Sequence, residues 1–280
     1  IRAKTIWSFA FSETSFAPLK GLPLIEKSSG HFVSKNFATI INLEEGFVFD
    51  DDGKVVDVAG SSFFIKDSRI KPSPAEIKVI ANGALSSISQ ILNKPPLKVL
   101  DRLQQPVNFG NAQVSGEGKI GLLLKSNLTS DEISYEINGT AERFSSKVIN
   151  PDFNFSEGSL DFFANKKGFE IKGNGKVENF PIQAQLSGTM ENDETKILKI
   201  DFNLSEQALE MLPFSIPGIK VSGSAPAKLY LKFLENKKVE FELSSNLKGV
   251  ELSYLPLGWV KKIDDDAELK ASGALGDEFV

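Results

Sequence analysis

The sequence contains no cysteine, and this absence removes several classes of function at once. Without cysteine the chain can form no disulfide, no thiolate metal site and no cysteine nucleophile. Histidine is nearly as scarce, because His31 is the only one, and we expect its side chain to be solvated after a Ser-Ser-Gly turn. A Ser-His-Asp triad would have to use His31, yet no G-x-S-x-G motif supplies a serine. We therefore expect no enzyme activity, no cofactor and no metal site.

Basic clusters and long apolar runs are also missing. The formal net charge is −5, and no group of Lys and Arg interleaved with aromatics stands out along the chain, so we expect no nucleic-acid partner. No run approaches the roughly 18 to 20 apolar residues that span a bilayer. The chain begins with Ile1 and stops soon after a strand-like stretch, which suggests a fragment, so the missing targeting segment says nothing about the full protein.

Phenylalanine is abundant, with 22 residues against 3 tyrosines and 2 tryptophans. Its ring adds apolar bulk without a polar group that needs a buried partner. This bias suits a surface that is apolar throughout, and it equally suits an ordinary β core. Two aspartate runs, 50–52 and 264–266, lie where turns are expected and lack the spacing of an EF-hand loop, so we expect solvated turns there.

Alternation of apolar and polar residues dominates from His31 onward and predicts antiparallel strands with one dry and one wet face. In the segment 198–204, for example, Leu198, Ile200 and Phe202 oppose Lys199 and Asp201. A sheet of about a dozen such strands must cover its dry face. The candidates for that face are Ile120, Leu122, Leu124, Ile133, Tyr135, Ile137, Phe169, Ile171, Leu198, Ile200, Phe202, Leu229, Leu231, Phe233, Val239, Phe241 and Leu243.

Two short segments carry helical spacing instead. In 84–94, Leu85, Ile88 and Ile91 recur at helical intervals before Pro95 and Pro96, and a second short helix is predicted with Leu97, Leu100 and Leu103 on one side. In 205–212, Ser205 is the expected N-cap of a helix from Glu206 to Leu212.

Internal repetition organises the chain. Val-Ser-Gly followed by an alternating hairpin occurs at Val114 and again at Val221, and Glu-Gly anchors at Glu45 and Glu157 have nearly the same spacing. Repeats of this kind bury apolar faces against their neighbours. We predict a lead-in at 1–30, a first β unit at 31–148 with a helical insert near 84–103, a second at 149–248 with an insert near 205–212, and a truncated third unit at 249–280.

A long one-sided sheet can close as a barrel, pair as a sandwich, or curl into a trough that holds something apolar. Repetition favours the trough, because a closed barrel has no end to which further units can be added. The predicted fold class is mainly β: an elongated, curled antiparallel β-sheet groove built from repeated units, each with a short helical insert.

This pattern resembles the AsmA-like proteins of Gram-negative bacteria, in particular the YhdP-like branch. The resemblance runs through most of the chain, including LPLIEKSSGHF, EEGFVFDDDGKVVDVAG, SEGSLDFFANKKGFEIKGNGKVENFPIQAQLSG, ISQILNKPPLKVLDRL with VSGEGKIGLLLK, and VELSYLPLGWVKKIDDDAELKASG. It implies a periplasmic segment of an inner-membrane-anchored protein that shields phospholipid acyl chains in an apolar groove between the inner and outer membranes. The implied partners are phospholipid, the membrane through regions outside this chain, and envelope proteins.

The resemblance transfers no functional residue, so the candidates for a groove lining rest on alternation alone. An alternative of a different class is a structural or assembly factor for outer-membrane proteins, whose exposed sheet edges bind partners by strand addition.

Overall fold

The computed structural model describes residues 5–17, 23–94, 98–102, 106–125, 132–147, 153–189, 195–212, 218–234 and 238–275. The chain divides into two compact units, Ile1–Lys166 (unit 1) and Lys167–Val280 (unit 2). Fifteen strands belong to a large antiparallel sheet, and short helical inserts interrupt it. The predicted fold class, mainly β with a large antiparallel sheet, is confirmed. The repeat boundaries expected at 31–148 and 149–248 stay a prediction.

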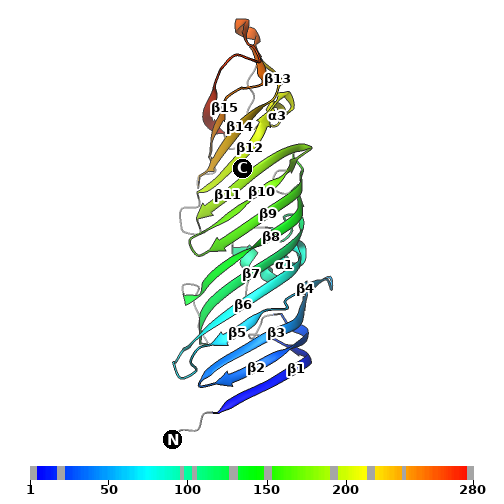
Figure 1. The fold of residues 1–280 in the computed structure, drawn as a ribbon, viewed down its shortest axis with the longest axis vertical. Coiled ribbons are helices and arrows are strands. Elements are labelled where there is room, and N and C mark those ends of the chain that lie inside the picture. The colour runs from blue at the N-terminus through cyan, green and yellow to red at the C-terminus, as the bar shows by residue number, and fades with distance from the viewer. Residues whose placement is uncertain are drawn as a thin grey trace. The chain divides into compact units, whose positions relative to one another are not determined.

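The described residues of unit 1 form nine strands and two helices, which Figure 1 shows in blue to green. The strands pair in the order β1-β2-β3-β4-β6-β7-β8-β9, and β5, like β4, pairs with both β3 and β6. Their bounds are β1 (Ile6–Phe16), β2 (Ile25–Lys35), β3 (Ala38–Phe49), β4 (Val55–Asp57), β5 (Ser62–Ile65), β6 (Ser73–Ala84), α1 (Leu85–Asn93), α2 (Val99–Arg102), β7 (Asn111–Leu124), β8 (Ser134–Ser146) and β9 (Phe155–Asn165).

Unit 2 contributes the order β10-β11-β12-β14-β15-β18 to the large sheet and forms a three-stranded sheet β13-β16-β17 of its own. The bounds are β10 (Gly168–Val177), β11 (Phe180–Thr189), β12 (Lys196–Leu204), α3 (Glu206–Glu210), β13 (Ile219–Gly223), β14 (Ala225–Phe233), β15 (Val239–Ser245), β16 (Val250–Tyr254), η2 (Leu255–Leu257), β17 (Trp259–Lys261) and β18 (Leu269–Leu275).

β-Bulges bend the sheet of unit 1 at two sites, and β3 carries a further extra residue in its pairing with β2. Glu13 in β1 and Lys27 in β2 have positive φ angles, and so do Arg143 in β8 and Glu157 in β9. β1 has an extra residue relative to β2 at one point of their pairing, and β2 has an extra residue relative to β1 at the next point. The same happens between β8 and β9. The two shifts cancel, so each pair of strands returns to its original register beyond the bulges. Bulges increase local twist and bend a strand. The strand ends beyond the bulges therefore turn away from the plane of the sheet.

Aromatic contacts hold these turned ends in place. Phe11 and Phe16 pack edge to face with ring centroids 6.3 Å apart, and Phe144 lies 5.6 Å from Phe155. A serine hydroxyl adds a hydrogen bond at one of these sites, where Ser28 Oγ donates to the Thr14 carbonyl at 2.8 Å. The first pair of strands in unit 1, β1 and β2, and the last pair, β8 and β9, are thus both held in a bent form by a bulge together with a contact between two Phe rings.

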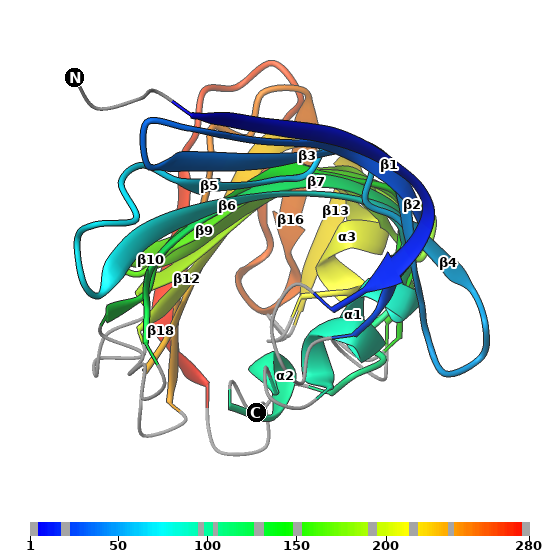
Figure 2. The same cartoon turned by 90° about the horizontal axis from the view of Figure 1, so that it is seen from below.

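Helix α1 lies on the concave side of the unit 1 sheet, as Figure 2 shows. Its Ile88 and Ile91 pack against a buried cluster that includes Leu43, Val48 and Val56. The helix predicted for 84–94 is confirmed. For the second predicted helix, the structure places α2 at Val99–Arg102 with Leu100 buried, whereas Leu97 and Leu103 lie outside the described residues.

The turn between β3 and β4 contacts the C-terminal end of helix α1. Asp50 is buried, and its Oδ1 accepts hydrogen bonds from the backbone N–H groups of Asp52 at 2.9 Å and Lys54 at 2.8 Å. Asp51 forms an ion pair with Lys94 at the end of α1, with 2.8 Å between Oδ1 and Nζ. The expectation of a fully solvated turn is wrong for Asp50, because α1 packs over a turn that the sequence pattern treats as isolated.

In unit 2 the chain leaves the large sheet after β12 and returns at β14. Ser205 caps α3 as predicted, with its Oγ accepting from the Ala208 N–H at 3.2 Å, although the helix ends at Glu210. Gly223 joins β13 to β14 with a φ of +87°, and a Cβ there would lie 2.3 Å from the Gly249 carbonyl oxygen. The second Val-Ser-Gly therefore ends a strand of the small sheet, whereas the first lies inside the continuous strand β7.

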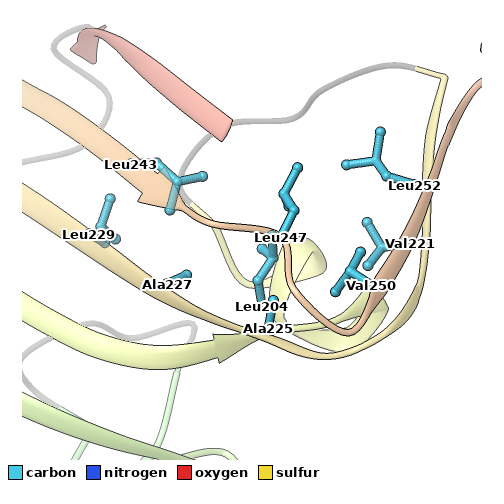
Figure 3. Close-up of a cluster of buried hydrophobic side chains, with 9 residues drawn as sticks. All are labelled: Leu204, Val221, Ala225, Ala227, Leu229, Leu243, Leu247, Val250 and Leu252. Atoms are coloured by element: carbon cyan, nitrogen blue, oxygen red, sulfur yellow. The ribbon is translucent and has the colours of Figure 1, made fainter. Parts of the chain in front are cut away.

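The small sheet and α3 cover one end of the large sheet in unit 2. Figure 3 shows Leu204, Ala225 and Leu247 lying between side chains of the large sheet, such as Leu243, and of the small sheet, such as Val250. Lys261 is buried beside this core, and its ammonium donates to the carbonyls of Leu247 and Val250 and, at 3.4 Å, Ile263. Three backbone acceptors replace the water that a buried ammonium loses.

Candidate functional site

A row of apolar side chains crosses unit 1 from β1 to β8. Residues directly opposite in paired strands point to the same face of a sheet, so each register pair extends the row by one strand. The row reads Phe9, Phe32, Ile41, Phe63, Ile77, Ile120 and Tyr135. The rings of Phe9 and Phe32 stack with centroids 4.7 Å apart. We call the side of the sheet that carries this row the apolar face of unit 1.

Unit 2 carries rows of the same kind. Ile171, Leu186, Leu198, Leu231 and Phe241 are consecutive cross-strand partners from β10 to β15. The next row in the same direction contains Ala184, Ile200, Leu229, Leu243 and Ala271. We call this side the apolar face of unit 2.

The opposite faces are polar in the same register. In unit 1 the neighbouring row is His31, Asn42, Ser62, Lys78, Lys119, Glu136 and Asn165, and in unit 2 it is Lys172, Gln185, Lys199, Tyr230, Glu242 and Ser272. His31 lies 2.9 Å from Glu44 on this exposed face, and Lys78 pairs with Glu117 at 3.2 Å. Apolar exceptions on that face are Phe163 and a short row of cross-strand partners, Val33, Ile40 and Phe64.

Each apolar face is partly covered by its own unit. In unit 1, Leu43 is two residues from Ile41 in β3, so it shares the apolar face, and α1 packs over it. Elsewhere on that face Trp7, Phe9 and Ile137 expose 68%, 55% and 38% of their surface. In unit 2, Leu229 and Leu243 are buried under the small sheet, whereas Leu198 and Leu231 are only partly buried. The covered parts form ordinary core, and the rest is apolar surface.

The structure brings the predicted lining residues onto these two faces. Ile120, Leu122, Leu124, Tyr135 and Ile137 lie on the apolar face of unit 1, and Ile133 directly precedes β8. On the apolar face of unit 2 lie Phe169, Ile171, Leu198, Ile200, Phe202, Leu229, Leu231, Phe233, Val239, Phe241 and Leu243. Their common facing follows from the register. Their role as a lipid lining stays a prediction, and Leu122, Leu229, Val239 and Leu243 are buried within their own units.

Sequence reasoning missed five of the seven residues in the unit 1 row. Phe9, Phe32, Ile41, Phe63 and Ile77 were not among the candidates, although each sits in a segment with alternating apolar residues. The signal was present in Phe9 and Phe11 of β1 and in Ile41 and Leu43 of β3. Short strands such as β5 carry too few residues for alternation to be read with assurance.

The site offers apolar surface and little reactive chemistry. Among the described residues no group of three His, Asp or Glu side chains is placed to hold a metal ion. In that part of the chain no helix has both the length and the apolar composition to cross a bilayer. Comparison with known proteins found no matching family model, no matching curated protein and no matching solved structure.

Proposed function

We propose that the chain shields lipid acyl chains on the apolar faces of its two units. The observation that carries the proposal is the in-register row of seven apolar side chains in unit 1, which continues across consecutive strands while large members such as Phe9 remain exposed. Monomeric soluble proteins rarely leave large contiguous apolar surface in water without a binding role.

The energetics favour acyl chains as the occupant. Moving an acyl chain into water costs roughly 0.8 kcal/mol per methylene, so a chain of about sixteen carbons meets a barrier of roughly 13 kcal/mol when it is unshielded. A curled apolar face removes much of that barrier and requires no specific polar contact. A lining of Phe, Leu, Ile and Val, with few Tyr or Trp, suits this task.

The biological setting extends the same proposal. The sequence patterns that resemble the YhdP-like branch of AsmA-like proteins suggest phospholipid as the cargo and the periplasm of a Gram-negative bacterium as the location. In that setting the chain is one segment of an inner-membrane-anchored bridge that serves outer-membrane biogenesis. We propose no enzymatic step and no cofactor.

Lipid mass spectrometry on the gently purified chain tests the proposal. The variant Ile137→Glu with Leu198→Glu places a charge on each apolar face, and the control Asn138→Glu with Lys199→Glu places the same new residues one position along the same strands, on the polar faces. We expect bound phospholipid in the wild type and the control and its loss in the apolar-face variant. Absence of lipid from all three, with circular dichroism showing intact folds, would refute the proposal.

Photo-crosslinking supplies an independent readout. Probes at Ile137, Ile200 and Leu231 on the apolar faces should capture lipid, whereas probes at Lys199 and Glu240 on the polar face should not. Equal capture at both sets would mean that lipid associates without regard to facing.

A second candidate, the assembly factor, is favoured by one observation. In the described part of the chain β1 pairs only with β2, so its outer edge presents unpaired backbone groups over 11 residues. Such an edge can accept a partner strand. A peptide that pairs with the outer edge of β1 and displaces no lipid would support the assembly-factor hypothesis. Replacing Ala10 with proline should abolish the binding of that peptide.

A further inference from the structure

Three segments that are distant in the sequence bring basic and large apolar side chains together at one end of the unit 1 strands. They are the start of β1, the β2–β3 turn and the β5–β6 loop, which lie on the same side of the unit in Figures 1 and 2. Two contacts join the turn to the loop. The Ser68 N–H donates to the Phe37 carbonyl at 2.8 Å, and the Arg69 guanidinium lies 4.3 Å from the centroid of the Phe37 ring.

The start of β1 belongs to the same corner by register. Trp7 pairs with Ser34, next to Lys35, and Ser34 pairs through Thr39 with Ile65 at the start of the β5–β6 loop. Trp7, Phe37 and Ile70 expose 68%, 49% and 53% of their surface. We name the group the corner patch: Trp7, Lys35, Phe37, Lys66, Ile70 and Lys71.

The charge of this corner is opposite to that of the whole chain. Residues 34–37 and 66–73 contain Lys35, Lys66, Arg69 and Lys71 but only one acid, Asp67, whereas the chain has a net charge of −5. Asp67 is engaged by Arg69, with 2.7 Å between Oδ2 and Nη2. Within the described ranges no carboxylate forms an ion pair with Lys35, Lys66 or Lys71, and all three are exposed.

We propose that the corner patch docks on the surface of an anionic phospholipid bilayer. Exposed lysines gain free energy near negatively charged headgroups, and Trp and Phe side chains favour the interfacial layer just below them. A surface that is both basic and aromatic meets both requirements at once. The proposal goes beyond acyl-chain shielding, because it concerns one end of the unit 1 strands, where Trp7 of the apolar face meets exposed lysines, and because it predicts dependence on headgroup charge.

The sequence alone shows no such cluster, because its members come from separate segments of the chain. Lys35 and Phe37 are separated from Lys66, Ile70 and Lys71 by the whole of β3, β4 and β5. Only the antiparallel return of the chain, with its Ser68–Phe37 hydrogen bond, places them side by side.

Vesicle sedimentation tests the proposal. One set of vesicles contains equal parts of phosphatidylglycerol and phosphatidylcholine, and the other contains phosphatidylcholine alone. We compare the wild type with Lys35→Gln/Lys66→Gln/Lys71→Gln and with the charge-matched control Lys172→Gln/Lys199→Gln/Lys228→Gln, whose three lysines are exposed on the polar face of unit 2.

The wild type and the control should bind the anionic vesicles and release them as salt is raised. Each lysine near such a surface changes affinity by about fivefold, so the corner variant should bind roughly a hundredfold more weakly. Equal binding to both vesicle types, equal loss in both variants, or no binding at all would overturn the proposal. Uptake of lipid by the apolar faces does not depend on the corner lysines, so failure of docking leaves that function testable on its own.

Trp7 provides a second measurement within the patch. In a Trp259→Phe background Trp7 is the only tryptophan. Its emission should shift to the blue with anionic vesicles and be quenched by lipids brominated high on the acyl chain. An unchanged spectrum would overturn docking through this corner. Self-association that the corner variant abolishes in the absence of lipid would instead identify a second copy of the chain as the occupant.

Discussion

The apolar face of unit 1 should respond to truncation in two ways, depending on whether α1 covers the residue. Leu43 is 6% exposed and packs in the cluster beneath α1. Ile137 lies on the same face but is 38% exposed. Leu43→Ala should lower the free energy of unfolding by about 2–5 kcal/mol, because it removes buried methyl groups and leaves a cavity.

The same truncation at Ile137 should have a smaller effect. Since more than a third of the side chain is already in water, roughly 1–1.5 kcal/mol of transfer free energy is at stake, and the surface is open so that no closed cavity forms. Urea unfolding followed by Trp7 fluorescence in a Trp259→Phe background measures unit 1 selectively, provided that the m value is unchanged. Equal losses at Leu43 and Ile137 would refute the division into covered core and open surface.

The same unfolding experiment can be repeated in the presence of lipid. At a free lipid concentration about 100-fold above the dissociation constant, bound lipid should raise the free energy of unfolding by about 2.7 kcal/mol. Leu43→Ala should retain that increment, because Leu43 lies under α1 and away from the open surface. Ile137→Glu should lose it. An increment that survives Ile137→Glu in full would place the lipid elsewhere.

Two further predictions concern the acidic turns. Asp50→Ala should destabilise unit 1 by about 1–3 kcal/mol, because two backbone N–H groups lose their acceptor. Asp51→Ala breaks only the exposed ion pair with Lys94 and should cost less than about 1 kcal/mol. Similar losses for the two variants in urea unfolding would contradict the burial argument. Hydrogen bonds from Arg69 lower the pKa of Asp67 to about 2. The stabilisation from this exposed pair should therefore be complete above about pH 4 and be lost as the pH falls through the lowered pKa of about 2. NMR titration should find the pKa of Asp67 near its ordinary value in Arg69→Gln.

The strands could be predicted because alternation is a local signal. Leu198, Ile200 and Phe202 share a face in any straight strand, whatever surrounds it, and the structure places them as the sequence indicates. The helix over 84–94 was likewise predictable from Leu85, Ile88 and Ile91, with prolines directly after it. In both cases the spacing of the apolar residues, every second residue in the strand and every third or fourth in the helix, shows which side chains share a face.

The coverage of the sheet could not be read in this way. Asp50 resembles its neighbours Asp51 and Asp52 in sequence, and only the packing of α1 separates a buried carboxylate from solvated ones. The second Val-Ser-Gly looks like the first, but the left-handed backbone at Gly223 sends the preceding strand into another sheet. Such differences depend on contacts between distant segments, which a repeat in sequence does not reveal.

The paired bulges of unit 1 have a consequence for how the chain can change in length. An extra residue in one strand inverts the facing of every side chain beyond it, so Glu13 or Lys27 alone would turn the end of its strand inside out. Because each is matched by the other, both strands change phase together and Phe11, Phe16 and Ile25 still meet in one cluster. The extra residue of β2 is also matched by one in β3, so the compensation extends over three strands. Removing any one of the three alone would expose that cluster to water, whereas removing all three would straighten the corner and keep the dry side dry.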